Sequence, residues 1–415
     1  MRWPICLLFL IAGHAASAAD GPALSFDEAV ARALAGAPQV SARAEGAAAT
    51  RELAISAGRL PDPALMVGVN DLPVNGPDAG STTADFMTMR MVGVMQEFPR
   101  REKRRLARDR ALSDVDLADA QLAETSLDVA RRAAQAWIRR AAFETALEDL
   151  RALRPEVQLG ADAARAGVAG GRASTAEALA AEAAVVRLDN RILEMETEAH
   201  HARVELARWI DVDAERPLGP TPAFDRLPEP VSALLANVER HAPILPFEAR
   251  LEAARTDVAL ARAEKRPDWS AALSFAKRGP DFSDMASLQF TIELPLFAKR
   301  RQNPVIAARS AELRQIEADR ETTLRSHTAE VHKMLVEWEQ AGRRLEQYDR
   351  ELLPLARERA AAALAAYRAS SGGFQLALDA FEEEIEAAVE RALLADARGR
   401  AWAFLRYLEP RQLPR

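Results

Sequence analysis

The chain has almost no cysteine and few aromatic residues. Its single cysteine is Cys6, and aromatic residues make up 6% of the 415 residues. A chain without its N-terminal segment would therefore have no disulfide and no cysteine metal ligand. The formal net charge of −7 argues against a nucleic-acid-binding surface. No Gly-x-Ser-x-Gly, phosphate-binding loop or His-Glu-x-x-His motif is present, so we expect neither an enzyme nor a bound cofactor or resident metal.

Long apolar runs are also rare. The sequence has one, at the N-terminus: Arg2 precedes the apolar stretch from Trp3 to Gly13, and Ala16-Ser17-Ala18 follows. This pattern predicts a secretory signal peptide at residues 1–18. Cys6 does not precede a plausible mature start, so no lipid-anchored N-terminus is predicted. The rest of the chain has no apolar run long enough for a transmembrane helix.

The clearest pattern is a long helical hairpin between Pro304 and Tyr407, broken at Gly372-Gly373. Apolar residues recur every seven positions in its first limb, which is typical of coiled-coil packing. One column contains Ile306, Leu313, Met334, Ala341 and Tyr348, and the other contains Leu324, Val331, Trp338, Leu345 and Leu352. The first half of the chain has a similar hairpin, broken at Gly167, Gly170 and Gly171, with Ser174 capping the return helix.

Each hairpin follows a helix and two segments with alternating apolar residues. The helices are predicted at 24–57, with Ser25 and Glu28 as a capping box, and at 231–265. The strands are predicted at 65–70, 85–96, 269–275 and 288–294. The two halves repeat at an offset of about 200 residues. The predicted organisation is a signal peptide (1–18), a first repeat (19–215), a Pro-rich linker (216–230), a second repeat (231–409) and a tail (410–415).

Four strands cannot form a closed barrel alone, and open strand edges are not tolerated in lipid. Three chains would together supply twelve strands. The chain resembles the TolC family of outer-membrane efflux proteins. The resemblance rests on Leu24-Ser25-Phe26-Asp27-Glu28-Ala29, the Pro-Asp before each strand pair, the Lys/Arg cluster after it, Glu351 to Ala356, and the tip from Ala366 to Gly373. Gly171-Arg172-Ala173-Ser174 resembles the heavy-metal, CzcC-like branch.

The resemblance implies a mainly α-helical fold class with a membrane β-barrel portion. Coiled-coil hairpins would form an α-helical barrel, and a homotrimer would share a twelve-stranded β-barrel. It implies an exit duct of a tripartite efflux system in the outer membrane of a Gram-negative bacterium, exporting heavy-metal cations. The implied partners are outer-membrane lipid, a periplasmic adaptor protein and an inner-membrane pump of the RND type. Alternatives are a periplasmic adaptor, an exported coiled-coil structural protein, or the same duct for drugs and other organic solutes.

The two hairpin tips are the candidate functional site. By resemblance they form the periplasmic end, where the adaptor docks and the idle channel is closed. The candidate residues are Arg165, Gly167, Gly171, Arg172, Tyr367, Arg368, Gly372 and Gly373. Alternatively, the glycines only end helices. Glu177 and Asp379 are candidate acids at the entrance, or acids favoured by the helix dipole.

Three other groups have competing interpretations. Met87, Met89, Met91 and Met95 share one strand face, and could form a soft thioether path for Cu(I); we favour a lipid-facing surface. The basic clusters Arg100 to Arg105 and Lys299 to Arg301 could bind anionic groups at the membrane boundary or form a solvated face. His200, His201, His327 and His332 are expected to be structural, because their spacing does not place two ligands on one helix face.

Overall fold

The computed structural model describes residues 22–369 and 371–413. The predicted signal peptide, with Cys6, lies outside the described residues. The chain forms two compact units. The hairpin unit contains Met1–Val40, Thr125–Asn237 and Thr328–Arg415, and the sheet unit contains Ser41–Glu124 and Val238–His327. Within the described residues, no helix combines the length and apolar content needed to cross a membrane.

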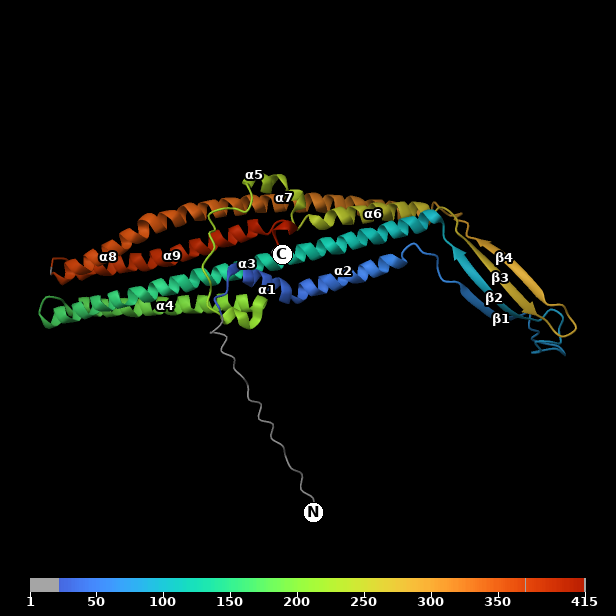
Figure 1. The fold of residues 1–415 in the computed structure, drawn as a ribbon, viewed down its shortest axis with the longest axis horizontal. Helices are drawn as coiled ribbons and strands as arrows, with labels where there is room; N and C mark the ends of the chain where they lie inside the picture. Colours follow the sequence, from blue (N-terminus) through green and yellow to red (C-terminus); the bar gives the residue numbers. More distant parts are fainter. Residues whose placement is uncertain (1–21, 370, 414–415) are drawn as a thin grey trace, which may run out of the picture. The chain divides into compact units, whose positions relative to one another are not determined.

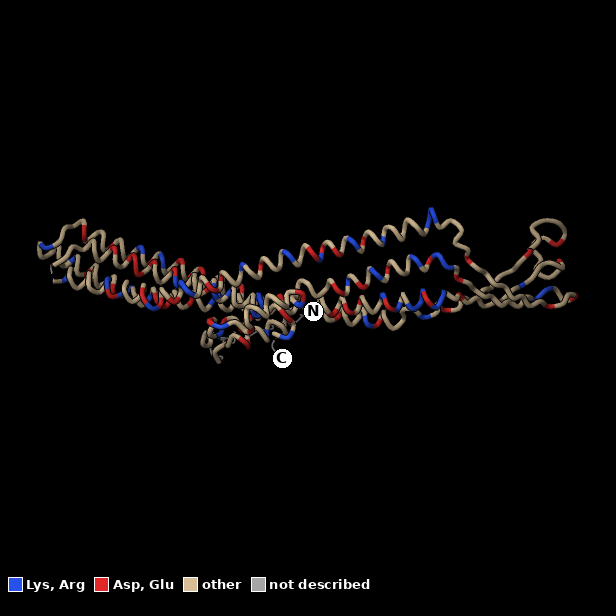
Figure 2. Tube along the Cα trace, turned by 90° about the horizontal axis from the view of Figure 1, so that it is seen from above, with Lys and Arg blue, Asp and Glu red and all other residues tan. Residues whose placement is uncertain are grey.

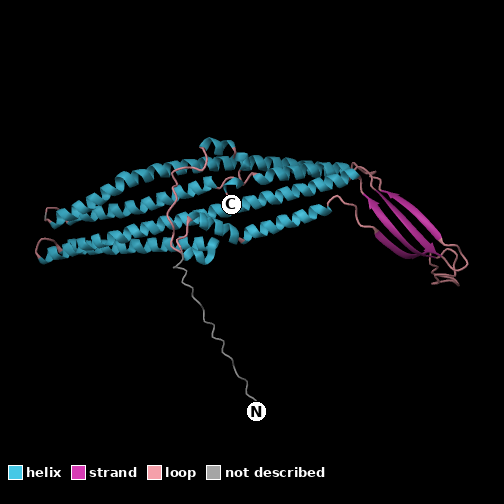
Figure 3. Cartoon of the chain, viewed as in Figure 1, coloured by secondary structure: helices cyan, strands magenta, loops and turns pink. Residues whose placement is uncertain are grey.

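The hairpin unit is built from long helices that pair in chain order (Figures 1 and 3). Helix α3 (Arg101–Ala169), which begins in the sheet unit, is followed by α4 (Thr175–Ile210), and α8 (Leu353–Arg368) by α9 (Phe374–Arg406). Helix α7 (Gln302–Gln347) also begins in the sheet unit and joins α8 through the π-helical turn η4 (Tyr348–Leu352). The shorter elements are α1 (Phe26–Gly36), η2 (Asp211–Glu215), α5 (Val231–Ala236) and η5 (Pro410–Gln412).

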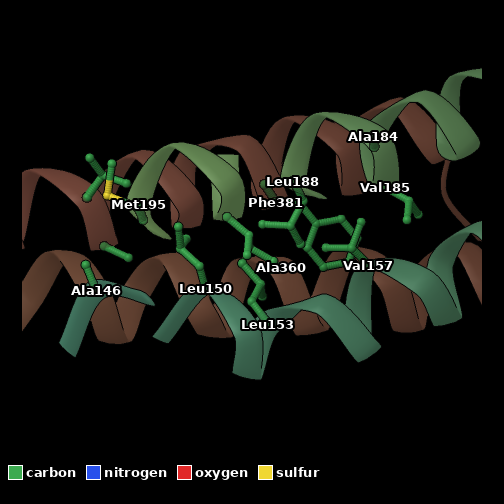
Figure 4. Packing of buried hydrophobic residues seen from close by; sticks show 14 of the residues in the cluster. Ala146, Leu150, Leu153, Val157, Ala184, Val185, Leu188, Met195, Ala360 and Phe381 are labelled. Carbon is green, nitrogen blue, oxygen red and sulfur yellow. The ribbon is translucent and has the colours of Figure 1, made fainter. Parts of the chain in front are cut away.

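The core of the hairpin unit lies between its two hairpins. Side chains from α3, α4, α8 and α9 form one apolar cluster, part of which Figure 4 shows. Its three phenylalanines, Phe143, Phe374 and Phe381, are at most 4% exposed, and alanine supplies many of the remaining contacts. Small side chains allow helices to approach closely over a narrow seam. The heptad pattern of α7 is confirmed in the same way: Val331 and Ala341 are buried, and most other seam positions are half-buried.

Equivalent tryptophans tie both repeats to the segments that precede them. The indole of Trp137 in α3 donates to the Leu24 carbonyl at 3.2 Å. The indole of Trp338 in α7 donates to the carbonyl of Phe224, in the Pro-rich linker, at 2.8 Å. A buried indole N–H needs such an acceptor. The two repeats predicted from the sequence therefore also share equivalent hydrogen bonds.

The sheet unit combines helices with one antiparallel sheet in the order β1-β2-β3-β4 (Figure 1). Its helices are most of α2 (Pro38–Ser56), the beginning of α3, η3 (Val238–Arg240), α6 (Leu245–Ala263) and the beginning of α7. The strands are β1 (Ala64–Asn70), β2 (Met89–Phe98), β3 (Trp269–Lys277) and β4 (Met285–Ile292). β1 and β4 are the two edges.

Bulky apolar side chains gather on one face of this sheet. The strand registers align them in cross-strand rows such as Leu65, Val94, Leu273 and Leu288. These residues are 70%, 49%, 61% and 63% exposed. Charges are dense along the helices and sparse in the strands (Figure 2). Such a face is unusual for a surface in water, because large contiguous apolar patches mark contact sites.

The register bears on our interpretation of the strand methionines. Met91 and Met95 pair with Ala276 and Ala272, which pair in turn with Met285 and Gln289. Methionine therefore shares its face with small and polar residues, while Arg90 lies on the bulky apolar face. The register therefore places methionine opposite the bulky apolar side chains, and this favours the other face as the lipid-facing one.

Proline explains two further differences from the predicted helices. The helix expected at 24–57 breaks at Ala37, whose backbone is extended (φ −72°, ψ 114°) before Pro38. A residue before proline avoids the α region. The helix expected at 231–265 is divided into α5, η3 and α6, with a turn around Pro243. Ser25 caps α1 as predicted, but the Glu28 carboxylate binds Arg32 and Arg216 instead of completing a capping box.

The two repeats differ in backbone conformation at their equivalent prolines, Pro155 and Pro354. α3 continues through Pro155 without a change of helix type. In the second repeat, the π turn η4 immediately precedes Pro354, which lies in the first turn of α8. A wider turn there accommodates the missing N–H. The repeats are therefore similar in sequence but not identical in backbone.

Candidate functional site

The first hairpin tip is closed by glycine and by a complete helix cap. The Gly167 carbonyl accepts from the Arg172 N–H at 2.8 Å, and Gly171 has φ +68°, a conformation that favours glycine. Ser174 and Glu177 form a reciprocal capping box at the start of α4, in which the Glu177 carboxylate accepts from the Ser174 N–H at 2.7 Å. The predicted Ser174 cap is confirmed.

The second tip is closed more loosely. The Ser371 N–H donates to the Ala366 carbonyl at 2.9 Å, and Gly372 lies close to Ala366. Gly373 is the N-cap of helix α9, which therefore has no side-chain cap. Phe374, the first residue of α9, is 1% exposed, and its ring packs edge-on against Tyr367 with centroids 4.8 Å apart. The aromatic pair, rather than a cap, holds the start of α9.

Tyr367 also connects the two tips. A Cβ atom at Gly167 would lie 3.2 Å from the Tyr367 hydroxyl and 2.9 Å from Ala173 Cβ. Gly167 is buried, so only the absence of its side chain leaves room for this contact. Two of the predicted tip residues, one from each repeat, therefore meet within the hairpin unit.

The environment of Tyr367 disfavours its ionised form. Burial raises the pKa of Tyr367, the charge of Glu177 raises it further, and Arg172 partly offsets this effect. The hydroxyl has no hydrogen-bond partner among the described residues. Tyr367 therefore contributes packing at the tips, with Glu177 and Arg172 as its charged neighbours.

The other predicted tip residues lie outside this contact. Arg165 binds Glu182 of α4 at 2.6 Å, and Asp379 accepts from Gln375 at 2.7 Å. Arg368 and Gly373 are exposed. The sequence analysis missed Glu182, Ala173 and Phe374. Of these three residues, Phe374 was the easiest to predict from the sequence, because an aromatic residue directly after a tip glycine suggests a buried anchor.

Valine at Gly167 should push the two tips apart. Overpacking costs about 1–2 kcal/mol, because the added atoms would collide with Ala173 and Tyr367. We expect a lower free energy of unfolding, measured by chemical denaturation. Gly170→Val is the matched control, since Gly170 is exposed and no atom lies closer than 3.4 Å to its added Cβ. Equal effects of both substitutions would contradict a specific Gly167–Tyr367 contact.

The first basic cluster is tied to the Pro-Asp motif rather than simply solvated. Asp268 accepts from Lys103 Nζ at 2.6 Å and from the Arg100 N–H at 2.8 Å. Lys103 also contacts Glu264 at 3.0 Å. Burial lowers the pKa of Lys103, but its hydrogen bonds to Asp268 and Glu264 outweigh burial and the net shift is upward. The motif before β3 therefore anchors the helix that follows β2.

Two histidines form a buried pair. The His241 Nδ1 atom lies 3.1 Å from His327 Nε2, and the side chains are 0% and 4% exposed. His200, His201 and His332 are exposed. No group of three or more His, Cys, Asp or Glu residues suited to a metal ion occurs in the described parts of the chain. The geometry is that of a hydrogen-bonded imidazole pair.

This combination of duplicated helical hairpins and a four-stranded sheet is the fold of outer-membrane channel proteins. The outer-membrane channel OprN is 17% identical with a TM-score of 0.79, over 94% of this chain and 91% of that chain. VceC of Vibrio cholerae is 19% identical with a TM-score of 0.75, over 92% and 94%. The CmeC outer-membrane channel of Campylobacter jejuni is 14% identical with a TM-score of 0.77, over 93% and 86%.

The similarity is one of fold. A scan against protein-family models finds no match, and a search of curated protein sequences finds none either. The structural matches cover nearly the whole of both chains, so they include both hairpins and the sheet. The predicted fold class, a mainly helical chain with long hairpins and four strands, is confirmed.

Proposed function

We propose that this protein is the outer-membrane exit duct of a tripartite efflux system. The observation that carries the proposal is the sheet, which exposes a bulky apolar face and ends in two edge strands, β1 and β4, each paired on one side only within the described residues. Exposed edges and apolar faces need a partner. Lipid against the face and further copies of the chain against the edges would satisfy both needs.

A homotrimer is the proposed assembly. Three chains would close a twelve-stranded barrel in which β4 of one subunit pairs with β1 of the next. A closed barrel leaves no unsatisfied edge in lipid. The hairpins would then form an α-helical barrel on the periplasmic side of the outer membrane.

The intrachain junction between β2 and β3 supplies a test of this trimer. Asp268 precedes β3 and binds Lys103, which follows β2. In the repeat, Asp62 corresponds to Asp268, and Lys299 of Lys299-Arg300-Arg301 corresponds to Lys103 of Lys103-Arg104-Arg105, so Asp62 and Lys299 would meet between neighbouring subunits. Asp62→Lys should destabilise each junction by about 1 kcal/mol and lower the trimer fraction measured by native mass spectrometry.

A charge swap makes the test specific. Lys299→Asp combined with Asp62→Lys should restore trimer. Asp281→Lys, in the exposed turn between β3 and β4, is the control for added positive charge and should have no effect. Failure of the double variant to recover would contradict the proposed β4–β1 junction.

The hairpin tips are proposed to dock an adaptor protein and to close the idle channel. The support is the contact of Gly167 with Tyr367, because a tip contact between the two repeats would narrow this end when formed. An inner-membrane pump of the RND type would then deliver cargo through the adaptor. Arg172, Arg368 and the exposed Gly373 are the residues available to a partner.

Heavy-metal cations are the proposed cargo, and drugs or other organic solutes are the alternative. Support for metals comes from the resemblance of the first tip, Gly171 to Ser174, to the heavy-metal branch. Deleting the gene and measuring growth on zinc, cobalt, cadmium, copper, silver and antibiotics tests the choice. Lost drug tolerance with unchanged metal tolerance would contradict heavy-metal cations as the cargo, but it would agree with an exit duct.

Conductance distinguishes the duct from its rivals. The purified protein should run as a detergent-stable trimer and form channels in planar bilayers. A periplasmic adaptor is not expected to conduct ions. Two hairpins alternating with strand pairs are also not the organisation expected of an adaptor. An exported coiled-coil structural protein would also fail to conduct. A monomer without channel activity would overturn the proposal.

A further inference from the structure

The Pro-rich linker forms one wall of a cavity in the hairpin unit. The linker crosses α3 and α9 on its way to α5 (Figure 1), and the cavity beside it has a volume of about 340 Å³. Its other walls come from α3, α7 and α9, and most of the lining is apolar, as at Ile138, Ala142, Phe224, Leu345 and Ala395. Sites for small molecules have volumes of this order and apolar walls with a few polar groups.

Three charged side chains line the cavity, and one of them has no charged partner. The Nε atom of Arg391 lies 2.5 Å from the Asp349 carboxylate. The carboxylate of Asp225 lies 4.0 Å from Arg226. Arg398 forms no ion pair with a described residue, and its Nε atom is buried without a hydrogen-bond partner among those residues. The cavity therefore contains one positive charge that no carboxylate of the hairpin unit neutralises directly.

Helix α7 holds the guanidinium group of Arg398 in place. The Cζ atom lies 5.8 Å from the centre of the Trp338 ring, within the range of a cation–π contact. A Cβ atom at Gly342 would lie 2.9, 3.0 and 3.1 Å from the Nε, Cζ and Nη2 atoms of Arg398. These nearly equal distances place the guanidinium flat against the Gly342 backbone. An arginine positioned in advance loses less side-chain entropy when it binds a ligand.

We propose that this cavity binds a small organic carboxylate with an apolar body. A carboxylate can accept two parallel hydrogen bonds from a guanidinium group, and this geometry favours arginine over lysine. Binding would also give the buried Nε–H of Arg398 an acceptor, which removes the cost of an unpaired donor. The apolar body would contact the alanine and leucine side chains of α7 and α9. The site needs only the hairpin unit of one chain, so it does not depend on the proposed function.

The same lining argues against other kinds of ligand. A metal cation would be repelled by Arg398, and no cluster of three or more His, Cys, Asp or Glu residues occurs in the described parts of the hairpin unit. An inorganic phosphate would leave the apolar wall without contacts, and the second arginine, Arg391, is already bound to Asp349. A monocarboxylate with one apolar group matches both the charge and the wall.

A pair of fluorinated probes tests the site. The charged probe is para-trifluoromethylbenzoate, and the neutral probe of nearly the same shape is para-trifluoromethylbenzamide. Binding of each to the full-length protein in detergent is followed by fluorine NMR at neutral pH, with the signal of protein-free detergent subtracted. We expect the wild type to bind the benzoate at least about tenfold more tightly than the benzamide.

Two variants test the residues that carry the proposal. Arg398→Gln removes the charge and should bind both probes with affinities within about twofold of each other. Ala395→Leu fills part of the cavity and should weaken the binding of both probes by about tenfold or more. Chemical denaturation establishes that each variant is folded, and benzamide binding shows that the cavity is intact in Arg398→Gln.

Arg132→Gln is the matched control for loss of an arginine. Arg132 lies on α3 in the same unit, and it does not line this cavity. Its partner Asp128 keeps a second arginine, Arg131, at 2.5 Å, so the substitution releases no carboxylate. This variant should retain the wild-type preference for the benzoate.

Several outcomes would overturn the site. These are equal affinity of the wild type for the two probes, no binding of either probe, or a benzoate preference that survives in Arg398→Gln. Loss of the preference in Arg132→Gln would show a general effect of charge. Unchanged binding in Ala395→Leu would place the probes elsewhere on the protein, and it would equally contradict the proposal.

Discussion

Lysine in place of Phe290 should prevent most of the protein from remaining a trimer in lipid. Phe290 lies on the bulky apolar face of edge strand β4 and is 61% exposed. If that face contacts hydrocarbon, a lysine near the bilayer midplane costs about 2–4 kcal/mol. The ring also packs near Trp269, with centroids 6.3 Å apart, and this contact would be lost. The measurement is the urea dependence of trimer content after reconstitution into bilayers.

The adjacent position provides the control. Gln289 occupies the opposite face of the same strand, beside Ala272 in the register. Gln289→Lys adds the same charge at nearly the same depth, but on the face proposed to line water. We expect it to change stability by less than about 1 kcal/mol. Tolerance of Phe290→Lys equal to that of Gln289→Lys would favour the structural coiled-coil alternative, in which the apolar rows are incidental.

Acid should destabilise the fold through His241. Burial, together with the smaller effect of the charge of His327, lowers the pKa of His241 from 6.5 to about 4. Between these values the unfolded chain binds the proton and the folded chain does not, so the free energy of unfolding falls as pH falls. Each pKa unit corresponds to about 1.4 kcal/mol, so this group contributes a loss of up to about 3 kcal/mol by pH 4.

Denaturation at a series of pH values measures this contribution. His241→Gln should flatten the slope of unfolding free energy between pH 6.5 and pH 4, because glutamine does not titrate. His332→Gln removes an exposed histidine and should retain the wild-type slope. Carboxylates contribute equally to all three proteins and cancel in the comparison. An unchanged slope in His241→Gln would show that other groups dominate acid unfolding.

Most of the fold was predictable because its signals are periodic. The period of two in the strands and the heptads of α7 both follow from which side chains must avoid water. Helix ends were less predictable: the local backbone at Ala37-Pro38 divided one expected helix, whereas Pro155 did not interrupt α3. Tertiary packing decides whether a long helix absorbs a proline.

The tip contact and the methionine face needed the structure. Gly167 and Tyr367 lie far apart in the sequence, and nothing local reveals that the glycine makes room for the phenol ring. In β2, alternation separates methionine from Arg90, but it does not say which set faces lipid. Only the pairing of β2 with β1 and β3 shows that methionine lies opposite the bulky apolar side chains.

The unequal ends of the two tips have a dynamic consequence. Helix α4 starts with reciprocal Ser174–Glu177 hydrogen bonds, whereas α9 starts at Gly373 without one. Glycine at an N-cap costs only a few tenths of a kcal/mol relative to serine, but α9 also lacks the reciprocal glutamate hydrogen bond, so its first turn should unravel more often than that of α4. If the hairpin tips separate, the movement would then begin in the second repeat, while the first repeat keeps its position. Amide hydrogen exchange would register this as faster exchange at the start of α9.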